Sequence, residues 1–514
     1  MRTRFVRAFA AGVALAAASS GLAACGGSST AADAADTLTV GIPVKPQSLN
    51  PGKNGNGGQN IVQWLAYEPL IRMKSDGSFE PGLATDWAYV GEGNTAFTMT
   101  IRTDAKFADG TAVTSAAVAD SVNYYLANPG PLSHWLSGIT AAEATDESTV
   151  VISLDKPNPN LPQVFSQVAN WGDVISPAGL STPDKLTSET FGAGAYVLDP
   201  ERTIDGDHYT FDKNEQYWNA DEVGYDTVVI KVLADPNAAL QALRSNQIQV
   251  DLNANAAIAA QTGADIDVVE GPGFVQTTFL MDRAGEVTPA LGDVRVRRAL
   301  NLAVDREAIA TALGAGYEPT SQIAPEGNSG FDAALDDEYD YDPEAAKTLL
   351  AEAGYGDGFT VELLSTSVLG IDTTAQALAQ QWAGIGVQTE ITSVGVDLNQ
   401  LIADMASKQY PVVAFNTGTD MYTNALQNFA SPVSPLNPFA STGDEVLGAF
   451  DALSAASAEE QDARAVDLNT AVTEQAWFVP VARTGSYMFT RGIDDVGTIG
   501  KAGAMDVLDW KPAS

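Results

Sequence analysis

The chain has 514 residues, a formal net charge of −38 and 45% hydrophobic residues. This length exceeds what one hydrophobic core supports, so it predicts two or three domains with ample apolar material to bury. The strong negative charge argues against binding to nucleic acid or to anionic lipid headgroups, since both would be repelled. With one cysteine and two histidines, an intrachain disulfide is impossible and a Cys/His zinc site is disfavoured, so we expect no metal and no cofactor.

The first 24 residues predict a secretory signal. Arginines at positions 2, 4 and 7 precede an apolar run at 8–18, which is too short to span a membrane permanently. Leu-Ala-Ala-Cys-Gly then follows at 22–26 and resembles a bacterial lipobox, which implies that Cys25 is lipidated and becomes the new N-terminus. The alternative is an ordinary cleaved signal with an incidental cysteine. Residues 25–37 are small and polar, and they predict a flexible tether.

The body then alternates strand and helix signals. Apolar residues spaced by two predict strands, spacing by three and four predicts helices, and Gly, Asn and Pro mark the loops. In the first half, the expected elements are strand 38–42, loop 43–58, a helix from 61 toward 73, strand 97–101, helix 115–126 and strand 149–154. Strands at 228–233 and 248–252 flank a helix at 236–245, which predicts a βαβ unit.

The stretch 293–316 predicts two helices that share a corner. Val296, Ala299, Leu300, Ala303 and Val304 form one apolar stripe, so the first helix should cover a core and turn its arginines elsewhere. A carboxylate at position 305 can cap the second helix, and a glycine at 314 or 316 can end it. Strand 274–281 precedes this corner, and helix 344–353, strand 359–364, helix 373–385 and strand 386–391 follow it.

Several of these stretches resemble the family 5 solute-binding proteins, the peptide and nickel class of receptors for ABC importers. The resemblance rests on Asp-Val-Arg-Val-Arg-x-Ala-Leu followed by Asp-Arg-Glu within 293–307, on Tyr-Glu-x-Leu at 67–70, and on Lys-Phe-x-Asp-Gly-Thr at 106–111. Asp-Pro-x-x-Ala-x-x-Leu-Leu-x-x-Ala-Gly-Tyr at 342–355 matches almost residue for residue. The similarity covers nearly all of the chain after the signal.

This resemblance implies a two-lobed α/β fold of the large, three-domain, class II periplasmic-binding-protein type, with the ligand in a cleft between the lobes. The implied division is a signal at 1–24, a tether at 25–37, lobe I from 38–68, 190–275 and 485–514, an inserted domain at 69–189, and lobe II at 276–484. Two chain crossings near 273–277 and 482–487 should make the hinge.

The resemblance also suggests where ligand contacts lie. Peptide receptors of this family often hold the ligand's amino terminus with an Asp in a Trp-x-x-Asp loop; here Phe415 takes the Trp position and Gly418 the Asp position, although a carboxylate follows at 420. A buried amine without a carboxylate would be costly. The candidate ligand contacts are therefore Asn56 and Gly57, Trp135 beside His134, Phe274 and Gln276 on the hinge strand, and Phe415, Asn416, Thr417 and Asp420.

A receptor explains the sequence better than an enzyme does. The sequence contains no Gly-x-Ser-x-Gly and no HExxH motif, whereas binding and closure need neither. We expect a monomeric, lipid-anchored receptor on the outer side of the cell membrane that delivers a di- or oligopeptide to an ABC permease and its ATPase. An oligosaccharide or a metal chelate is the alternative ligand, and a secreted carboxylate-based hydrolase is a more remote alternative.

Overall fold

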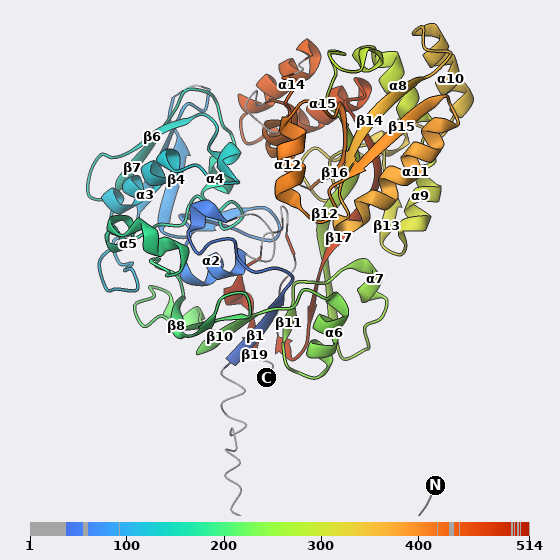
Figure 1. Cartoon of the computed structure of the whole chain (residues 1–514). Helices are drawn as coiled ribbons and strands as arrows, with labels where there is room; N and C mark the ends of the chain where they lie inside the picture. Colours follow the sequence, from blue (N-terminus) through green and yellow to red (C-terminus); the bar gives the residue numbers. More distant parts are fainter. Residues whose placement is uncertain are drawn as a thin grey trace, which may run out of the picture.

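A computed structural model describes residues 37–54, 60–91, 93–418, 420–430, 436–440, 443–494, 497, 499–500, 503 and 505–512. These residues form two α/β bodies that are joined by long strands (Figure 1). The two-lobed α/β fold expected from the sequence is therefore confirmed. The predicted signal, Cys25 and nearly all of the tether lie outside the described residues.

One large sheet runs through both bodies. Its strands are, in spatial order, β15 (Val387–Ser393), β14 (Phe359–Ser365), β16 (Val412–Thr417), β12 (Asp267–Leu280), β17 (Phe478–Thr490), β11 (Val250–Asp251), β1 (Thr37–Ile42), β10 (Thr227–Val232), β9 (His208–Lys213) and β8 (Tyr196–Ile204). A further strand, β13 (Tyr317–Pro319), pairs with β17. The two bodies thus share one hydrogen-bonded ladder.

Strands β12 and β17 connect the two bodies. They pair antiparallel along most of their length, and the pairing shifts register between Gly271 and Phe274 and again between Gln276 and Thr277. At one end β17 pairs with β11, and at the other β12 pairs with β16. A register shift bends and twists a strand locally, so these two positions are where the ladder can flex. The residues predicted to form the hinge, 273–277 and 482–487, lie on this stretch of the two strands, and the hinge motion itself stays a prediction.

The lower body in Figure 1 contains the predicted βαβ unit. Strands β10 and β11 both run parallel to β1, which lies between them. The connecting helix α6 (Pro236–Arg244) begins where Asp235 accepts hydrogen bonds from the N–H groups of Asn237 and Ala238, with Pro236 in the first turn. The short helix α7 (Ala256–Ala259) and α2 (Ile61–Ala66) complete this body.

The inserted domain is built on a second sheet. Its strands follow the order β4 (Ala84–Tyr89), β5 (Ala96–Ile101), β7 (Thr149–Leu154) and β6 (Ile139–Ala144). The accompanying helices are α3 (Ser115–Ala127), α4 (Leu161–Val164) and α5 (Pro177–Ser181). A small hairpin, β2 (Ile71–Met73) with β3 (Phe79–Pro81), lies near α4, and β18 (Ile493–Asp494) pairs with β19 (Lys511–Pro512) in the C-terminal segment. One continuous cluster of buried apolar residues runs from Leu38 through Ile152 to Trp510, so the inserted domain and lobe I share a core.

The other body, which we call lobe II, carries its helices on both faces of the sheet. They are α8 (Val294–Leu302), α9 (Arg306–Leu313), α10 (Pro343–Glu352), α11 (Ile371–Ala383), α12 (Leu398–Ala406), α13 (Met421–Ala425), the π-helical turn η9 (Leu426–Ala430), α14 (Asp444–Ser454) and α15 (Gln461–Glu474). Two separate apolar clusters, one around Leu300 and Trp382 and one around Phe279 and Phe429, fill this lobe.

The predicted corner of α8 and α9 forms as expected. All five residues of the apolar stripe are buried, Asp293 and Asp305 cap the two helices, and Gly314 ends the second with a φ of 108°. The arginines that the stripe was expected to turn away from the core behave as predicted, since Arg295 is exposed and Arg298 is half-buried. Two further arginines are buried. Arg297 and Arg306 are only 5% and 6% exposed, and both donate to backbone carbonyl groups within lobe II.

The helix expected over 61–73 is wrong in its second half. Helix α2 ends at Ala66, and residues Ile71–Met73 form strand β2 instead. Pro69 explains the break, because a proline disfavours helical dihedral angles at the residue before it and cannot donate a helical hydrogen bond. The predicted domain boundaries at 69, 190, 276 and 485 stay predictions.

Candidate functional site

The carboxyl ends of three parallel strands meet on the side of lobe II that faces the rest of the molecule. Strands β15, β14 and β16 run parallel, and β16 ends at Thr417, directly before the segment 418–420. In open α/β sheets, ligands bind at this end of the strands. Four of the candidate residues lie here: Phe415, Asn416 and Thr417 are consecutive, and Asp420 follows three residues later.

Strand β16 has one incompletely paired edge. On one side it pairs with β12 along its whole length, from Val412 to Thr417. On the other side β14 pairs with it only at Val412 and Val413. Among the described strands, none therefore covers the β14 side of Phe415, Asn416 and Thr417. Unpaired strand edges can accept an extended peptide by adding one more strand.

The side chains of this segment differ in how free they are. Phe415 is half-buried and packs edge-on against Phe279, with ring centroids 6.3 Å apart. Thr417 is buried, and its Oγ1 donates to the carbonyl of Ile323 at 2.8 Å. Asn416 is half-buried. Phe415 and Asn416 are thus the residues of β16 whose side chains retain exposed surface at the strand end.

The two candidate residues on the hinge strand β12 differ in burial and in their partners. Phe274 is half-buried and lies opposite Thr484 of β17. Gln276 is fully buried; its Nε2 donates to the carbonyl of Leu369 at 2.7 Å, and its Oε1 accepts from the hydroxyl of Thr374. Gln276 therefore joins the hinge strand to the start of α11. Its role as a ligand contact stays a prediction.

Gly418 occupies the position where the family pattern has an Asp. A Cβ added there would lie 3.2 Å from the Cβ of Phe274, which is closer than ordinary packing distances. A side chain at 418 would thus crowd the hinge strand. The carboxylate stands two residues later, at Asp420.

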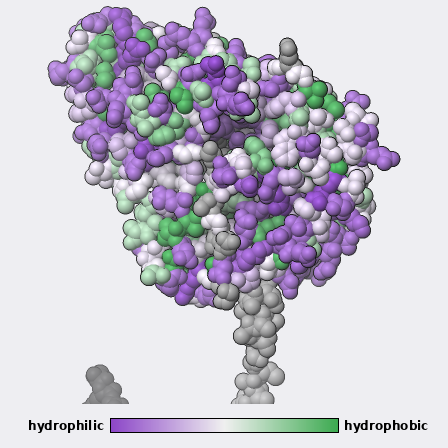
Figure 2. Space-filling model, turned by 180° about the vertical axis from the view of Figure 1, so that it is seen from behind, coloured by the Kyte–Doolittle hydropathy of each residue, from purple (hydrophilic) through white to green (hydrophobic). Residues whose placement is uncertain are grey.

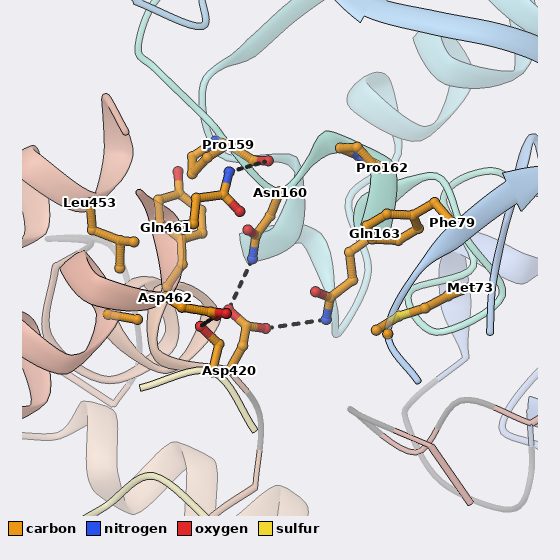
Figure 3. A pocket seen from close by; sticks show the side chains of 14 residues that line it. Met73, Phe79, Pro159, Asn160, Pro162, Gln163, Asp420, Leu453, Gln461 and Asp462 are labelled. Carbon is orange, nitrogen blue, oxygen red and sulfur yellow. Dashed lines mark hydrogen bonds between the residues drawn. The ribbon is translucent and has the colours of Figure 1, made fainter. Parts of the chain in front are cut away.

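Asp420 is held by three hydrogen bonds from two parts of the molecule. Its Oδ1 accepts from the backbone N–H of Thr423 at 3.0 Å and so caps helix α13. The same oxygen accepts from the Nδ2 of Asn160 at 2.9 Å, and Oδ2 accepts from the Nε2 of Gln163 at 3.2 Å. Both amides belong to the inserted domain (Figure 3). The carboxylate thus bridges lobe II and the inserted domain.

A pocket opens beside this bridge, between the hairpin β2–β3, helix α4 and helices α13 to α15 (Figure 3). It contains about 700 Å³ of empty space, part of it open to solvent. Two carboxylates, Asp420 and Asp462, line it together with apolar side chains such as Met73 and Phe79, and the described lining includes no Lys or Arg. Asp462 accepts from the hydroxyl of Ser329 at 2.9 Å. The pocket therefore favours neutral or cationic groups.

Trp135 lies apart from this pocket. It belongs to the 3₁₀ helix η3 (Ser133–Leu136), which contacts η9 of lobe II. Only 2% of its surface is exposed, so its ring faces protein rather than an open cleft. Its neighbour His134 is partly buried, and burial lowers the pKa of the His134 imidazole to about 4. Stacking of Trp135 on a ligand stays a prediction, and Asn56 and Gly57 lie outside the described residues.

A second cavity lies along the hinge strands. Glu270, Gly273, Glu318, Glu326 and Arg483 are among the residues that line it. Arg483 binds Asp336 at 2.5 Å, Glu318 at 2.9 Å and Glu326 at 3.4 Å. Burial opposes the charge on this guanidinium, but the carboxylates outweigh it and raise the pKa of Arg483. Arg483, the one arginine in the described lining of this cavity, is thus already paired with carboxylates.

Sequence reasoning missed the partners of Asp420. Asn160 and Gln163 follow a Pro-Asn-Pro stretch at 157–159 that reads as a turn, and no local pattern distinguishes them from surface amides. Only the packing of the inserted domain on lobe II brings them to Asp420. The described residues contain no group of three or more His, Cys, Asp or Glu that could hold a metal ion. Within the same residues, no helix is both long enough and apolar enough to cross a bilayer.

Comparisons with known proteins agree with this architecture. The glutathione-binding protein GsiB of Escherichia coli (strain K12) is 26% identical over 413 residues, which cover 78% of each chain. Two solved structures superpose over most of the molecule. DppA from Helicobacter pylori, in complex with the peptide STSA, gives a TM-score of 0.77 at 17% identity and covers 93% of this chain and 98% of that one.

The other is AgaA from A. tumefacien R10, in complex with agropinic acid, with a TM-score of 0.75 at 24% identity and coverage of 92% and 96%. The sequence model of the bacterial extracellular solute-binding proteins, family 5 Middle, matches residues 78–437, which is well over half of the chain. The chain belongs to the family 5 extracellular solute-binding proteins.

Proposed function

We propose that this protein is the substrate-binding protein of an ABC importer, which captures a di- or oligopeptide between its lobes and delivers it to a membrane permease and its ATPase. Family membership supports a binding role, and several relatives bind peptides or a peptide-like solute, namely glutathione, STSA and Met-Leu. Binding and lobe closure suffice for this task, so we propose no catalytic step.

The open edge of β16 is the observation that carries the peptide assignment. An extended peptide could bond its backbone to Phe415, Asn416 and Thr417, where β14 no longer pairs. The carboxylate of Asp420 follows three residues after Thr417 and faces a pocket whose described lining includes no basic side chain. An edge that recognises backbone groups, next to a carboxylate that recognises an ammonium group, matches the two features that all short peptides share.

A metal chelate or a sugar-like solute is the second candidate class. The observation that favours it is the displaced carboxylate: the family position is Gly418, and Asp420 is partly occupied by amides of the inserted domain. Neighbours of the same fold bind agropinic acid and Ni(L-His). A solute without a free amine would need no carboxylate at 418.

We also propose that the protein acts as a monomer anchored to the extracytoplasmic face of the cell membrane through lipidated Cys25. The lipobox-like sequence at 22–26 and the polar tether after it support this placement. Replacing Cys25 with Ser should release the protein from membranes into the soluble fraction. Retention of the variant on membranes after high-salt washing would count against lipidation as the anchor.

The ligand class can be tested without guessing the ligand. Native mass spectrometry of protein purified from its own cells should show a co-purifying compound, and calorimetry with that compound should give a single-site isotherm with no turnover. Small peptides would support the assignment, whereas a metal complex or a sugar derivative would replace it.

A matched pair of variants tests whether the ligand binds at the open edge of β16. Phe415→Ala should weaken binding about tenfold, because it removes an aromatic contact at the open strand edge. Gln388→Ala changes an exposed residue near the opposite end of β15 and should leave affinity unchanged. Equal effects of the two substitutions on affinity would show that the β16 edge is not the binding surface.

A further inference from the structure

Residues 157–163 of the inserted domain contact lobe II beside the pocket of Figure 3, in addition to the contact between η3 and η9. Besides the two amides on Asp420, the hydroxyl of Tyr422 donates to the carbonyl of Pro157 at 3.2 Å, and Gln461 donates to the carbonyl of Pro159 at 3.5 Å. Asn94, on the loop before β5, donates to the carbonyl of Ala456 at 3.2 Å. Among these contacts, Asp420 is the only charged group.

Asp420 is rigidly placed for this contact. Its bond to Thr423 fixes it at the first turn of α13. A carboxylate offers about four acceptor positions, and three of them are filled by Thr423, Asn160 and Gln163. No ion pair within 4 Å joins Asp420 to a described cationic side chain. The negative charge is therefore balanced by neutral amide donors, and hydrogen bonds to a charged acceptor are in general stronger than bonds between neutral groups.

The two amides are rigidly placed as well. The backbone N–H of Asn160 donates to the Oδ1 of Asn158 at 3.0 Å, and Asn158, which is fully buried, donates to the carbonyl of Ser137 at 3.2 Å. Gln163 lies on α4 and is only 7% exposed. Neither amide has another side-chain partner in the described part of the chain. Both are thus presented to lobe II by ordered structure and have no competing bond.

We propose that Asn160, Gln163 and Asp420 form a closure latch, which holds the inserted domain against lobe II when the interlobe cleft is closed. The latch closes the interlobe cleft on the side away from β12 and β17, where the lobes have no covalent connection. It rests on the proposed function only in that closure traps a ligand. The apparent affinity for any ligand bound in the closed state then depends on the fraction of molecules that the latch keeps closed.

The latch also gives Asp420 a double role. One acceptor position of its carboxylate remains for a donor from the ligand, so an ammonium group would add to the latch rather than replace it. A ligand with a second carboxylate at this place would instead repel Asp420 and favour the open form. Selection between ligands would therefore operate through closure as well as through direct contact.

Isosteric substitutions test the latch. Asn160→Asp and Gln163→Glu each place a carboxylate against Asp420. Without and with the co-purifying compound, these variants should be more open than the unsubstituted protein under the same conditions, with a larger radius of gyration in small-angle X-ray scattering in at least one of the two states. The apparent affinity for the co-purifying compound should fall about tenfold for each, as expected for one lost charge-assisted bond. Asn237→Asp, on the exposed first turn of α6, adds the same charge away from the latch and should change neither quantity.

A charge exchange provides the rescue. In the double variant Gln163→Glu with Asp420→Asn, the amide and the carboxylate trade places. The amide oxygen at position 420 still accepts from Thr423 and Asn160, and the NH2 group that replaces Oδ2 donates to the carboxylate at position 163. The double variant should return to the closed radius of gyration. Circular dichroism and thermal unfolding of each variant show whether it is folded.

The outcomes separate the latch from the transport role. Unchanged scattering in both Asn160→Asp and Gln163→Glu, or a double variant as open as its parent, overturns the latch. Opening of the ligand-free variants while no form of the protein binds any solute would keep the latch and overturn the receptor assignment.

Discussion

Two regions of lobe II use buried polar groups in opposite ways. In the corner of α8 and α9, Arg306 donates to the carbonyls of Asn301, Thr320 and Pro480, all within the same lobe. In the segment that ends at Asp420, the two side-chain donors come from a different domain. Polar groups satisfied inside one lobe hold that lobe rigid. Polar groups satisfied across the cleft can be lost without unfolding anything, which is what a reversible closure requires.

The largest effect on the free energy of unfolding is expected in the corner of α8 and α9. Arg306→Met should destabilise the protein by about 3–5 kcal/mol, because it leaves several buried carbonyl groups without a donor. Denaturation in urea should show a lower midpoint with an unchanged slope. Arg295→Met is the matched control: its side chain is 44% exposed and pairs with Asp293 on the surface, so we expect less than about 1 kcal/mol. Similar losses for both arginines would contradict the comparison.

An intermediate effect on the free energy of unfolding is expected in lobe I, at the buried acid Asp251. Asp251 is fully buried; one carboxylate oxygen accepts from the N–H of Asn253 at 2.8 Å, and the other has no hydrogen-bond partner among the described residues. Burial, partly opposed by that bond, raises the pKa of Asp251 to about 6. The folded protein thus keeps a proton that the unfolded chain releases near pH 4.

This difference in pKa between the folded and the unfolded state determines how the contribution of Asp251 to stability changes with pH. A raised carboxyl pKa favours the folded state at low pH, and this contribution is lost as pH rises from about 4 to about 6. Asp251→Asn should therefore stabilise the protein by about 1–2 kcal/mol at pH 7.5 and have no effect at pH 4. Urea denaturation at both pH values measures the gain. The exposed Asp221→Asn should show no such pH dependence, and an equal gain at both pH values for Asp251→Asn would refute the assignment.

The smallest effect on stability is expected at Asp420. Asp420→Asn keeps a good helix cap for α13 and removes only bonds that cross the cleft, so the free energy of unfolding should change by no more than about 0.5 kcal/mol. Scattering of the ligand-free protein should nevertheless show partial opening, since an amide cannot accept from both Asn160 and Gln163 equally well. A large loss of stability would show that the contact belongs to the folded core instead of the closure.

Local signals predicted the scaffold well. The apolar stripe from Val296 to Val304 and the capping carboxylates of α8 and α9 act within a few residues, and the sequence displays them directly. The helix predicted over 344–353 matches α10, which Asp342 caps with Pro343 in the first turn. The surface is also as the charge suggests: Figure 2 shows a mostly hydrophilic rear face with small, scattered hydrophobic areas.

Long-range contacts explain what could not be predicted. Whether Gln276 faces a ligand or Leu369 depends on where α11 packs, and the burial of Trp135 depends on the neighbouring segments of the inserted domain. The separation of Asn160 from Asp420 is 260 residues, so no window of sequence contains both. The fold class and the segment that ends at Asp420 could therefore be predicted, whereas the partners of that segment could not.

The single ladder through β12 and β17 has a consequence for how the receptor recloses. A flexible linker would let one lobe tumble relative to the other, and each closure would require a search over several angles. Two paired strands instead restrict the motion to bending and twisting near Gly271 and Gln276, so the effective concentration of one binding face at the other stays high. If the lobes open and close as proposed, reclosure becomes nearly a one-dimensional swing, and the sheet sets how the two faces meet.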